Sequence, residues 1–339
     1  MRRTTREDPL AATDQWFSGN GLAYFVPEER GRVRRALQPR RLVPLLLVVV
    51  VLAAATAASL AWVASTFSVG PAVLLTLVIG SVVWYALTAL RARSIVGWAL
   101  THTLVGVRVM LPMLSRALPL LLLFVTFLFI NAEVWQLTAS LRPGELWLTV
   151  LLFSGLAVAF LLVRLPEEVD LVDDHVDDAF LRRTCAGTPM QADCERLLAD
   201  PAADPASRAE VSGFERGNLV LALVVVQVAQ VTLMAVSVFG FFLLFGGLTM
   251  TDGVVESWTG RSPRAWSYLP NLSVELVQVS IFLAAFSALY LTVSTMTDES
   301  YREQFFGRVQ QHLESAVGVR AVYLTVRDAR SAAAAPPPD

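Results

Sequence analysis

Two carboxylates fall inside long apolar segments of this chain. Glu133 lies close to the amides of Asn131 and Gln136, and Glu275 lies near the start of another apolar segment. A carboxylate at membrane depth is costly and often belongs to a pathway for protons or cations. Both glutamates fall toward the same end of their segments, where interfacial water can solvate them. We therefore weigh a proton or cation pathway against a structural or interfacial role.

Two glutamines lie deeper in the apolar part of the sequence. Gln227 and Gln230 fall near the middle of the apolar segment 218–248 and share one face of a helix. Amide side chains in this position favour hydrogen bonds between neighbouring helices. The candidate intramembrane polar site therefore consists of Asn131, Glu133, Gln227, Gln230 and Glu275.

Known catalytic constellations are missing from the sequence. His102, His175 and His312 all fall outside the apolar segments, which argues against a membrane haem with two axial histidines and against a serine–histidine protease. The apolar segments contain no aspartate, and the chain contains no lysine. Phosphate loops, nucleophile elbows, zinc-protease pairs and dinucleotide fingerprints are also absent. We predict neither catalysis nor a cofactor.

The composition is that of a polytopic membrane protein. Of 339 residues, 55% are hydrophobic and 17% are charged, against about half and a quarter in soluble proteins. About 20 apolar residues of helix cross a bilayer. Six segments meet this requirement, and they predict an all-α helical bundle with six transmembrane helices: 42–66, 71–90, 117–138, 146–163, 218–248 and 272–295.

A seventh segment, 94–115, is also apolar but carries a polar stripe. Ser94, Thr101, Arg108 and Ser115 recur every seven residues, which is typical of a helix lying in the interface. Arginine counts support this reading, because arginines collect on the cytoplasmic side. With six spans, 24 of the 27 basic residues face the cytoplasm, and a seventh span would give 14 against 13. The three that face outward are Arg142, Arg261 and Arg264.

Segment 1–41 is rich in aromatic and basic residues. Such a pairing is explained by cytoplasmic topology with a short packed helix, or by binding to an anionic membrane surface. Nucleic-acid binding is not predicted, because the arginines adjoin a span and meet lipid phosphates first. The residues concerned are Trp16, Phe17, Tyr24, Phe25, Arg30, Arg32, Arg34, Arg35, Arg40 and Arg41.

Segment 165–216 forms an acidic cytoplasmic loop. Pro166 can open a helix, and His175 lies among the carboxylates, so a solvated acidic face is weighed against a divalent-cation site. We predict no metal site, and a possible docking surface for a protein partner. Cys185 and Cys194 are read as reduced thiols. The carboxylates expected on one helical face are Asp170, Asp173, Asp174, Asp177 and Asp178.

The remaining segments complete the layout. Two membrane segments are predicted between the cytoplasmic segments. The first, 42–164, contains the first four spans and the interfacial helix, and the second, 217–296, contains the last two spans. An amphipathic helix over 297–330 is expected to continue the last span, and an Ala- and Pro-rich tail over 331–339 is expected to be disordered. Small residues at helical spacing predict close packing. They are Ala53, Ala57, Ala61, Gly155, Ala159, Ser280, Ala284 and Ala288.

Several different polar motifs are distributed over most of the chain. They are Trp16-Phe17, Gly21-Leu22, Tyr24-Phe25-Val26-Pro27, Leu118-Pro119-Leu120-Leu121, Asn131-Ala132-Glu133-Val134-Trp135-Gln136, Gly187-Thr188-Pro189, Glu256-Ser257-Trp258-Thr259-Gly260 and Tyr301-Arg302-Glu303. With them the chain resembles a group of uncharacterised multi-pass membrane proteins of actinobacteria. The resemblance implies a bacterial plasma membrane and no particular activity.

Two functions follow as expectations. The first is a membrane-anchored interaction or scaffold protein, in which the bundle sits in the lipid bilayer and the acidic loop and terminal helix dock a partner. The alternative is a small-solute or ion transporter, proton-coupled, that uses Glu133, Glu275 and Gln227. Transport requires the two glutamates to face one another across a cavity that reaches the membrane centre.

Overall fold

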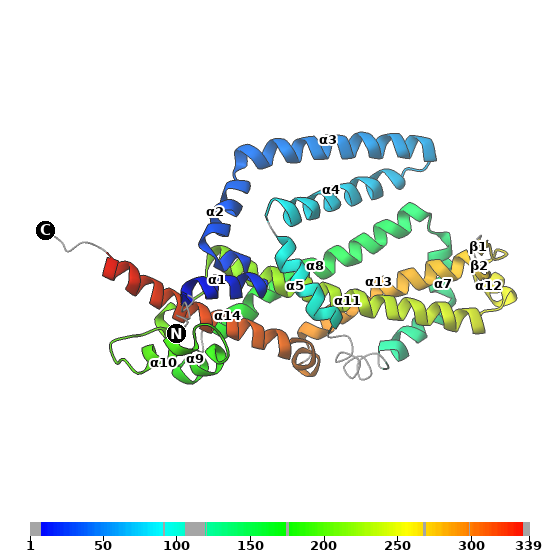
Figure 1. The fold of residues 1–339 in the computed structure, drawn as a ribbon. Helices are drawn as coiled ribbons and strands as arrows, with labels where there is room; N and C mark the ends of the chain where they lie inside the picture. Colours follow the sequence, from blue (N-terminus) through cyan, green and yellow to red (C-terminus); the bar gives the residue numbers. More distant parts are fainter. Residues whose placement is uncertain are drawn as a thin grey trace, which may run out of the picture.

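The computed structural model describes residues 8–90, 92–105, 119, 121–173, 176–266, 269–297 and 299–334. Nearly all of the described residues are helical, as predicted (Figure 1). The described residues also contain turns, loops and a short antiparallel pair, β1 (Ala265–Trp266) and β2 (Leu269–Ser273). The all-α bundle expected from the sequence is therefore confirmed, and this small hairpin is an addition to it.

Within the described part of the chain, five helices are continuous, long and apolar enough to cross a membrane. Each follows one predicted span, because apolar residues surround the helix on nearly all sides and lipid leaves no other partner for the backbone. They are α3 (Pro39–Ala64), α4 (Val69–Thr88), α8 (Pro143–Asp173), α11 (Gly213–Thr249) and α13 (Val274–Thr297).

The third predicted span, 117–138, is not a straight helix. It is divided into a helix over Leu121–Phe129 and α7 (Ala132–Ser140), which meet at a bend of 72°. Asn131 caps α7 by accepting the backbone N–H of Glu133 at 2.8 Å. The indole of Trp135 donates to the carbonyl of Phe129 at 2.7 Å, so a carbonyl freed by the break is paired. Among the described residues, 121–140 thus form a bent helix pair, the geometry of a broken span or of a re-entrant loop.

Counted as one span, this bent pair raises the number of candidate spans among the described residues to six. Helix α5 (Ala92–Val105) contacts α1 (Pro9–Gly19) at one end, whereas α7 contacts α12 (Asp252–Thr259) at the other. Helix α5 covers the start of the predicted interfacial segment 94–115 and buries Ile95 beside α11 and the N-terminal segment. Arg108 and Ser115 lie outside the described residues.

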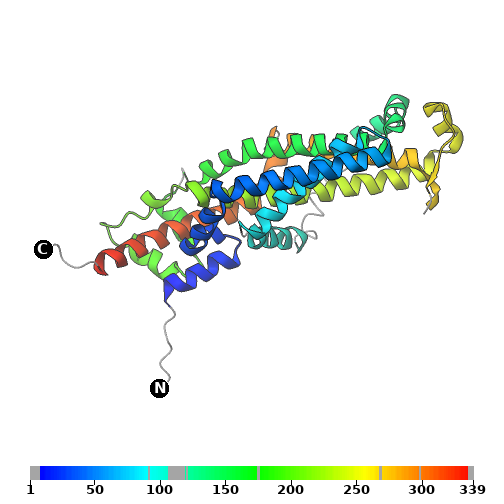
Figure 2. The same cartoon turned by 90° about the horizontal axis from the view of Figure 1, so that it is seen from above.

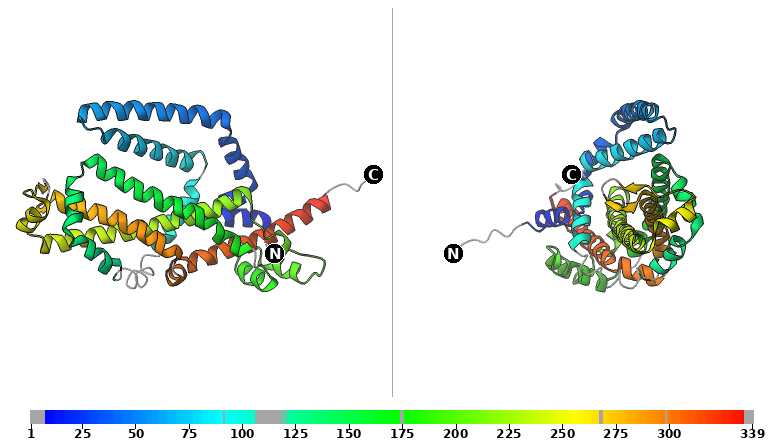
Figure 3. Two further views of the ribbon diagram at one scale, coloured as in Figure 1. Left: turned by 180° about the vertical axis from the view of Figure 1, so that it is seen from behind. Right: turned by 90° about the vertical axis from the view of Figure 1, so that its right-hand side faces the viewer.

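Helices α3 and α4 form a hairpin that stands beside the rest of the bundle (Figure 3). The predicted small-residue face of α3 packs on α4: Ala53 and Ala57 are buried there. The hairpin meets α8 near its tip, where the Trp147 indole donates to Thr76 Oγ1 at 2.8 Å. Gly155 and Ala159 of α8 are exposed, so the packing predicted for that face is not made within the described chain.

The opposite end gathers seven short or peripheral elements, which we call the terminal unit (Figure 2). It contains both described ends of the chain and the segment between α8 and α11. Its members are α1, η1 (Ala23–Phe25), α2 (Pro27–Ala36), α9 (Asp178–Cys185), α10 (Gln191–Leu198), η2 (Ala206–Arg208) and α14 (Glu299–Ala334).

Two expectations for the terminal unit were wrong. Pro166 lies inside α8, which continues to Asp173, so the acidic residues are divided between the end of α8 and the start of α9. Asp174 and His175 lie outside the described residues. Helix α14 begins at Glu299, two positions after the end of α13 at Thr297, and folds onto the unit. It also runs to Ala334, into the predicted tail, whose last residues, 335–339, lie outside the described part.

Candidate functional site

Asn131 and Glu133 have a local structural role. Asn131 is the N-cap of α7, and Glu133 occupies the first turn, where a carboxylate interacts favourably with the helix dipole. Both side chains are exposed. The pair therefore explains where α7 begins, and it lies at the end of the molecule away from the terminal unit.

Glu275 belongs to a different arrangement. It is 5% exposed at the start of α13, and its Oε1 accepts from Arg264 Nε at 2.9 Å. Its Oε2 accepts from the backbone N–H of Arg264 at 3.0 Å. Arg264 comes from the connection that leads into the β1–β2 hairpin, so this ion pair fastens that connection to α13. Glu275 does not point across a cavity to Glu133.

The two glutamines lie near the other end of α13. Gln227 is buried and donates to Thr295 Oγ1 at 3.4 Å, a contact between α11 and α13. Gln230 is 9% exposed, and its Oε1 has no hydrogen-bond partner among the described residues. Residues 275 and 295 are 20 positions apart, which is about 30 Å along a helix. The five predicted residues are therefore not one site.

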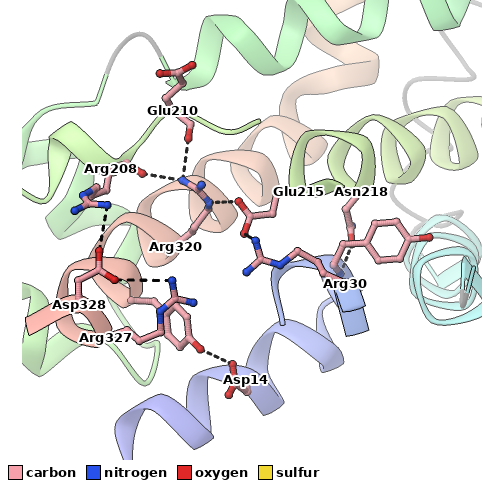
Figure 4. Close-up of polar contacts among 11 residues, drawn as sticks. Asp14, Arg30, Arg208, Glu210, Glu215, Asn218, Arg320, Arg327 and Asp328 are labelled. Carbon is pink, nitrogen blue, oxygen red and sulfur yellow. Dashed lines mark hydrogen bonds and ion pairs between the residues drawn. The ribbon is translucent and has the colours of Figure 1, made fainter. Parts of the chain in front are cut away.

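The structure instead gathers polar residues inside the terminal unit (Figure 4). Glu215, in the first turn of α11, is 3% exposed. Its Oε1 pairs with Arg30 of α2 at 2.8 Å, and its Oε2 pairs with Arg320 of α14 at 2.6 Å. Arg320 also donates to the backbone carbonyls of Arg208 at 2.7 Å and Glu210 at 3.0 Å. We call Glu215, Arg30 and Arg320 the Glu215 cluster.

The Glu215 cluster is a fully bonded ion network. Both carboxylate oxygens are paired, and Arg320 satisfies two carbonyls of the chain that precedes α11. A buried charge is tolerated only when it is paired and hydrogen-bonded in this way. The cluster thus joins the N-terminal segment, the loop and the C-terminal helix to the start of a membrane span.

Asn218, one turn further along α11, holds the N-terminal segment as well. Its Oδ1 accepts the backbone N–H of Tyr24, and its Nδ2 donates to the carbonyl of Gly21, both at 2.9 Å. Gly21 has φ +71°, and a Cβ on it would lie 3.0 Å from the Trp98 ring of α5. Only glycine fits this turn without strain. The N-terminal segment is therefore docked at a defined position on α11.

The aromatic residues of segment 1–41 face the protein interior. Phe17 is fully buried, with its ring 5.4 Å from that of Phe25 and 5.5 Å from that of Tyr323. The Tyr323 hydroxyl donates to Asp14 Oδ1 at 2.9 Å. Of the explanations considered for this segment, the packed helix is the one that the structure supports. The aromatic groups that a membrane surface would contact form the core of the terminal unit.

Most acidic residues described in the loop have partners within the chain. The contacts either cap a short helix, close a turn or pair with an arginine. They are Asp170 with Arg216 at 2.6 Å, Asp177 with the Phe180 N–H at 2.7 Å, Asp193 with Arg196, Asp200 with the Ala202 N–H at 3.0 Å and Asp204 with the Ser207 N–H at 3.2 Å. No group of three potential metal ligands occurs among the described residues.

Cys185 and Cys194 lie side by side in the core beneath α9 and α10. Both thiols are free and 1% exposed. Burial raises the pKa of both thiols above the ordinary value, so they are protonated at neutral pH. Because the thiolate is the nucleophilic form, the pair is suited to packing.

Sequence reasoning missed Glu215, Asn218 and Arg320. Arg320 had a visible signal, since it interrupts the apolar run from Val317 to Tyr323. A charged residue on the buried side of a helix implies a buried partner. Glu215 gave no such signal in the sequence, because a carboxylate in the first turn of a helix is common at exposed positions.

Stability of the terminal unit is expected to fall at alkaline pH. Burial, together with the hydrogen bond to Asp14, raises the pKa of Tyr323 to about 12 from its ordinary value of 10.0. Between these values the unfolded chain loses the phenolic proton while the folded chain keeps it, so unfolding becomes easier as the pH rises. We expect the melting temperatures of the wild type and Tyr323→Phe to converge from pH 10 to 12. Parallel curves would contradict this account.

Comparisons with models of known protein families, with curated proteins and with solved structures found no match for this chain.

Proposed function

We propose that this chain is a membrane-anchored interaction protein of the bacterial plasma membrane, with both termini in the cytoplasm. The observation that carries the proposal is the terminal unit: three segments distant in sequence fold into one body and are fixed to a span by the Glu215 cluster. The 24 to 3 division of arginines supports a cytoplasmic location for this unit.

The surface of the terminal unit supports a polar, exchangeable partner. Among the side chains described in 8–37, 176–212 and 311–333, Leu37 is the one large apolar residue that is exposed. The outer faces of α9 and α10 carry both signs of charge, including Asp178, Arg182 and Glu195. Such surfaces resemble those of complexes that form and dissociate. The loop segment therefore remains the proposed docking surface.

Transport gains no support from this geometry. Glu133 lies exposed in the first turn of α7, and Glu275 is held by Arg264, so neither is placed to pass a proton to the other. The glutamines belong to α11, and Gln227 contacts α13 at Thr295, roughly 30 Å along that helix from Glu275.

The test is photo-crosslinking in intact cells. We expect a photoreactive residue at Ala179 or Ala192, both exposed on α9 and α10, to capture the same protein. Ser18, exposed on α1, is the control within the unit, and Ser257, exposed on α12, is the control at the other end. Reversing a nearby charge with Glu195→Arg should lower the yield at least threefold without changing the resistance of the unit to trypsin.

The outcome that would overturn the proposal is equally clear. If Ala179 and Ala192 gave no crosslinked product, or gave the same products as Ser257, the loop would not be a docking surface. Deleting the loop is a poor test, because α9, α10 and η2 all contact α14 and their loss would expose its core.

A further inference from the structure

A groove runs along the membrane bundle between α8, α11 and α13. Its volume is about 360 Å³, which lies within the range of about 300–1,000 Å³ typical of small-molecule sites. Close-packed interiors rarely leave a void larger than a water molecule. A groove of this size must be filled by something other than the chain's own described side chains.

Alanines create the groove. Helix α13 contributes Ala284, Ala285 and Ala288, and the neighbouring faces of α8 and α11 add Ala157 and Ala235. These short side chains leave space where leucine would fill it. Ala284 and Ala288 were predicted to bring helices together, and they line this groove as well. All lining residues are uncharged.

The groove lies at the depth of the bilayer hydrocarbon and opens sideways. On α8 it extends from Val150 to Leu161, which is central in that span. Twelve residues of helix measure about 17 Å, close to half of the roughly 30 Å hydrocarbon core. Val236, which is 60% exposed, and Val228 lie on its rim. An occupant is therefore a hydrocarbon chain about one leaflet long.

A positive group lies beyond the end of the groove nearer the terminal unit. Arg164 follows Leu161 by three positions, and hence lies on nearly the same face of α8. Its side chain is 45% exposed and pairs with Glu167 at 2.8 Å. An exposed pair of this kind is weak, so the guanidinium can also bind a phosphate at headgroup depth.

We propose that one anionic phospholipid of the leaflet next to the terminal unit binds here, with an acyl chain in the groove and its phosphate at Arg164. The inference is independent of the proposed cytoplasmic partner. The groove would make the lipid a stoichiometric component of the bundle, held between three spans rather than exchanging with bulk lipid.

The test counts retained lipid by native mass spectrometry after purification from membranes in mild detergent. We expect one phosphatidylglycerol per chain in the wild type, and at least a tenfold loss of occupancy in Ala285→Phe and in Ala235→Phe, which fill the groove from different helices. The matched control is Ala159→Phe, an exposed position of α8 outside the groove. Its occupancy should equal that of the wild type.

The headgroup contact is tested separately. Delipidated wild-type protein is supplied with phosphatidylglycerol or with phosphatidylcholine. We expect its occupancy by the anionic lipid to be at least threefold higher. Arg164→Gln should abolish this preference, whereas Arg41→Gln, an exposed arginine at the start of α3, should keep it. Equal occupancy in the groove-filling and control variants would overturn the site. So would a bound molecule without a phosphate, or a second chain in its place.

Discussion

Glu215→Gln is expected to unfold the terminal unit while leaving the bundle in the membrane. The substitution keeps the shape of the side chain but removes the negative charge that neutralises Arg30 and Arg320. Arg320 is then left as a buried cation, since its side chain is only 10% exposed. Removing one partner of a buried ion pair costs about 3–5 kcal/mol. Few single changes in this chain should have a larger effect.

The readout is trypsin cleavage of α14 in protein reconstituted into nanodiscs. Each 1.4 kcal/mol is a factor of ten, so cleavage through local opening should accelerate roughly a hundredfold or more. The control is Glu167→Gln, which breaks an exposed pair on α8 and should change stability by less than about 1 kcal/mol. Arg30→Gln should fall between the two, because Arg30 is 29% exposed. Equal rates in all variants would show that the cluster does not hold the unit together.

Gly318→Ala is expected to separate α9 from α14. A Cβ at Gly318 would lie 2.8 Å from the Cβ of Thr184 and closer still to its hydroxyl, which no ordinary contact allows. One of the two helices must shift, and overpacking of this kind costs about 1–3 kcal/mol. The cost opposes the gain of up to about 1 kcal/mol that alanine brings to a helix interior. Hydrogen exchange of the α9 backbone measures the result.

Gly217→Ala is the matched control for this prediction. Gly217 is also helical, and a Cβ on it would meet nothing within 4 Å. It should stabilise its helix slightly, so the two glycine substitutions are expected to have opposite signs. Adding Thr184→Ala to Gly318→Ala should restore part of the protection of α9. A single Gly318→Ala variant that behaves like Gly217→Ala would show that α9 does not pack closely on α14.

The apolar segments were predictable because few backbone conformations are stable in lipid. A span must satisfy its own backbone, and composition alone locates it. The bend in the third predicted span escaped this reasoning, although Asn131 followed by Glu133 is a helix start that the sequence displays. The segment is otherwise rich in leucine and phenylalanine, so its hydrophobicity predicted one continuous span and the N-cap at Asn131 was not recognised.

The polar site could not be predicted because its partners lie far apart in sequence. Arg320 and Glu215 are 105 positions apart, and Asn218 and Tyr24 are 194 apart. Nothing local to either residue indicates the other. Glu133 and Glu275 were predicted as site residues because they are carboxylates in apolar segments. Both have structural roles: Glu133 lies in the helix turn capped by Asn131, and Glu275 pairs with Arg264.

The packing of Phe17 against Tyr323 also constrains how the protein is made. These residues are about 300 positions apart, and synthesis at about 5–20 residues per second separates them by about 15–60 s. Throughout that time the aromatic side chains at the beginning of the chain lack the helix that later covers them. The nascent N-terminal segment therefore waits without its packing partner, and a chain released before α14 is complete would keep these aromatic residues uncovered.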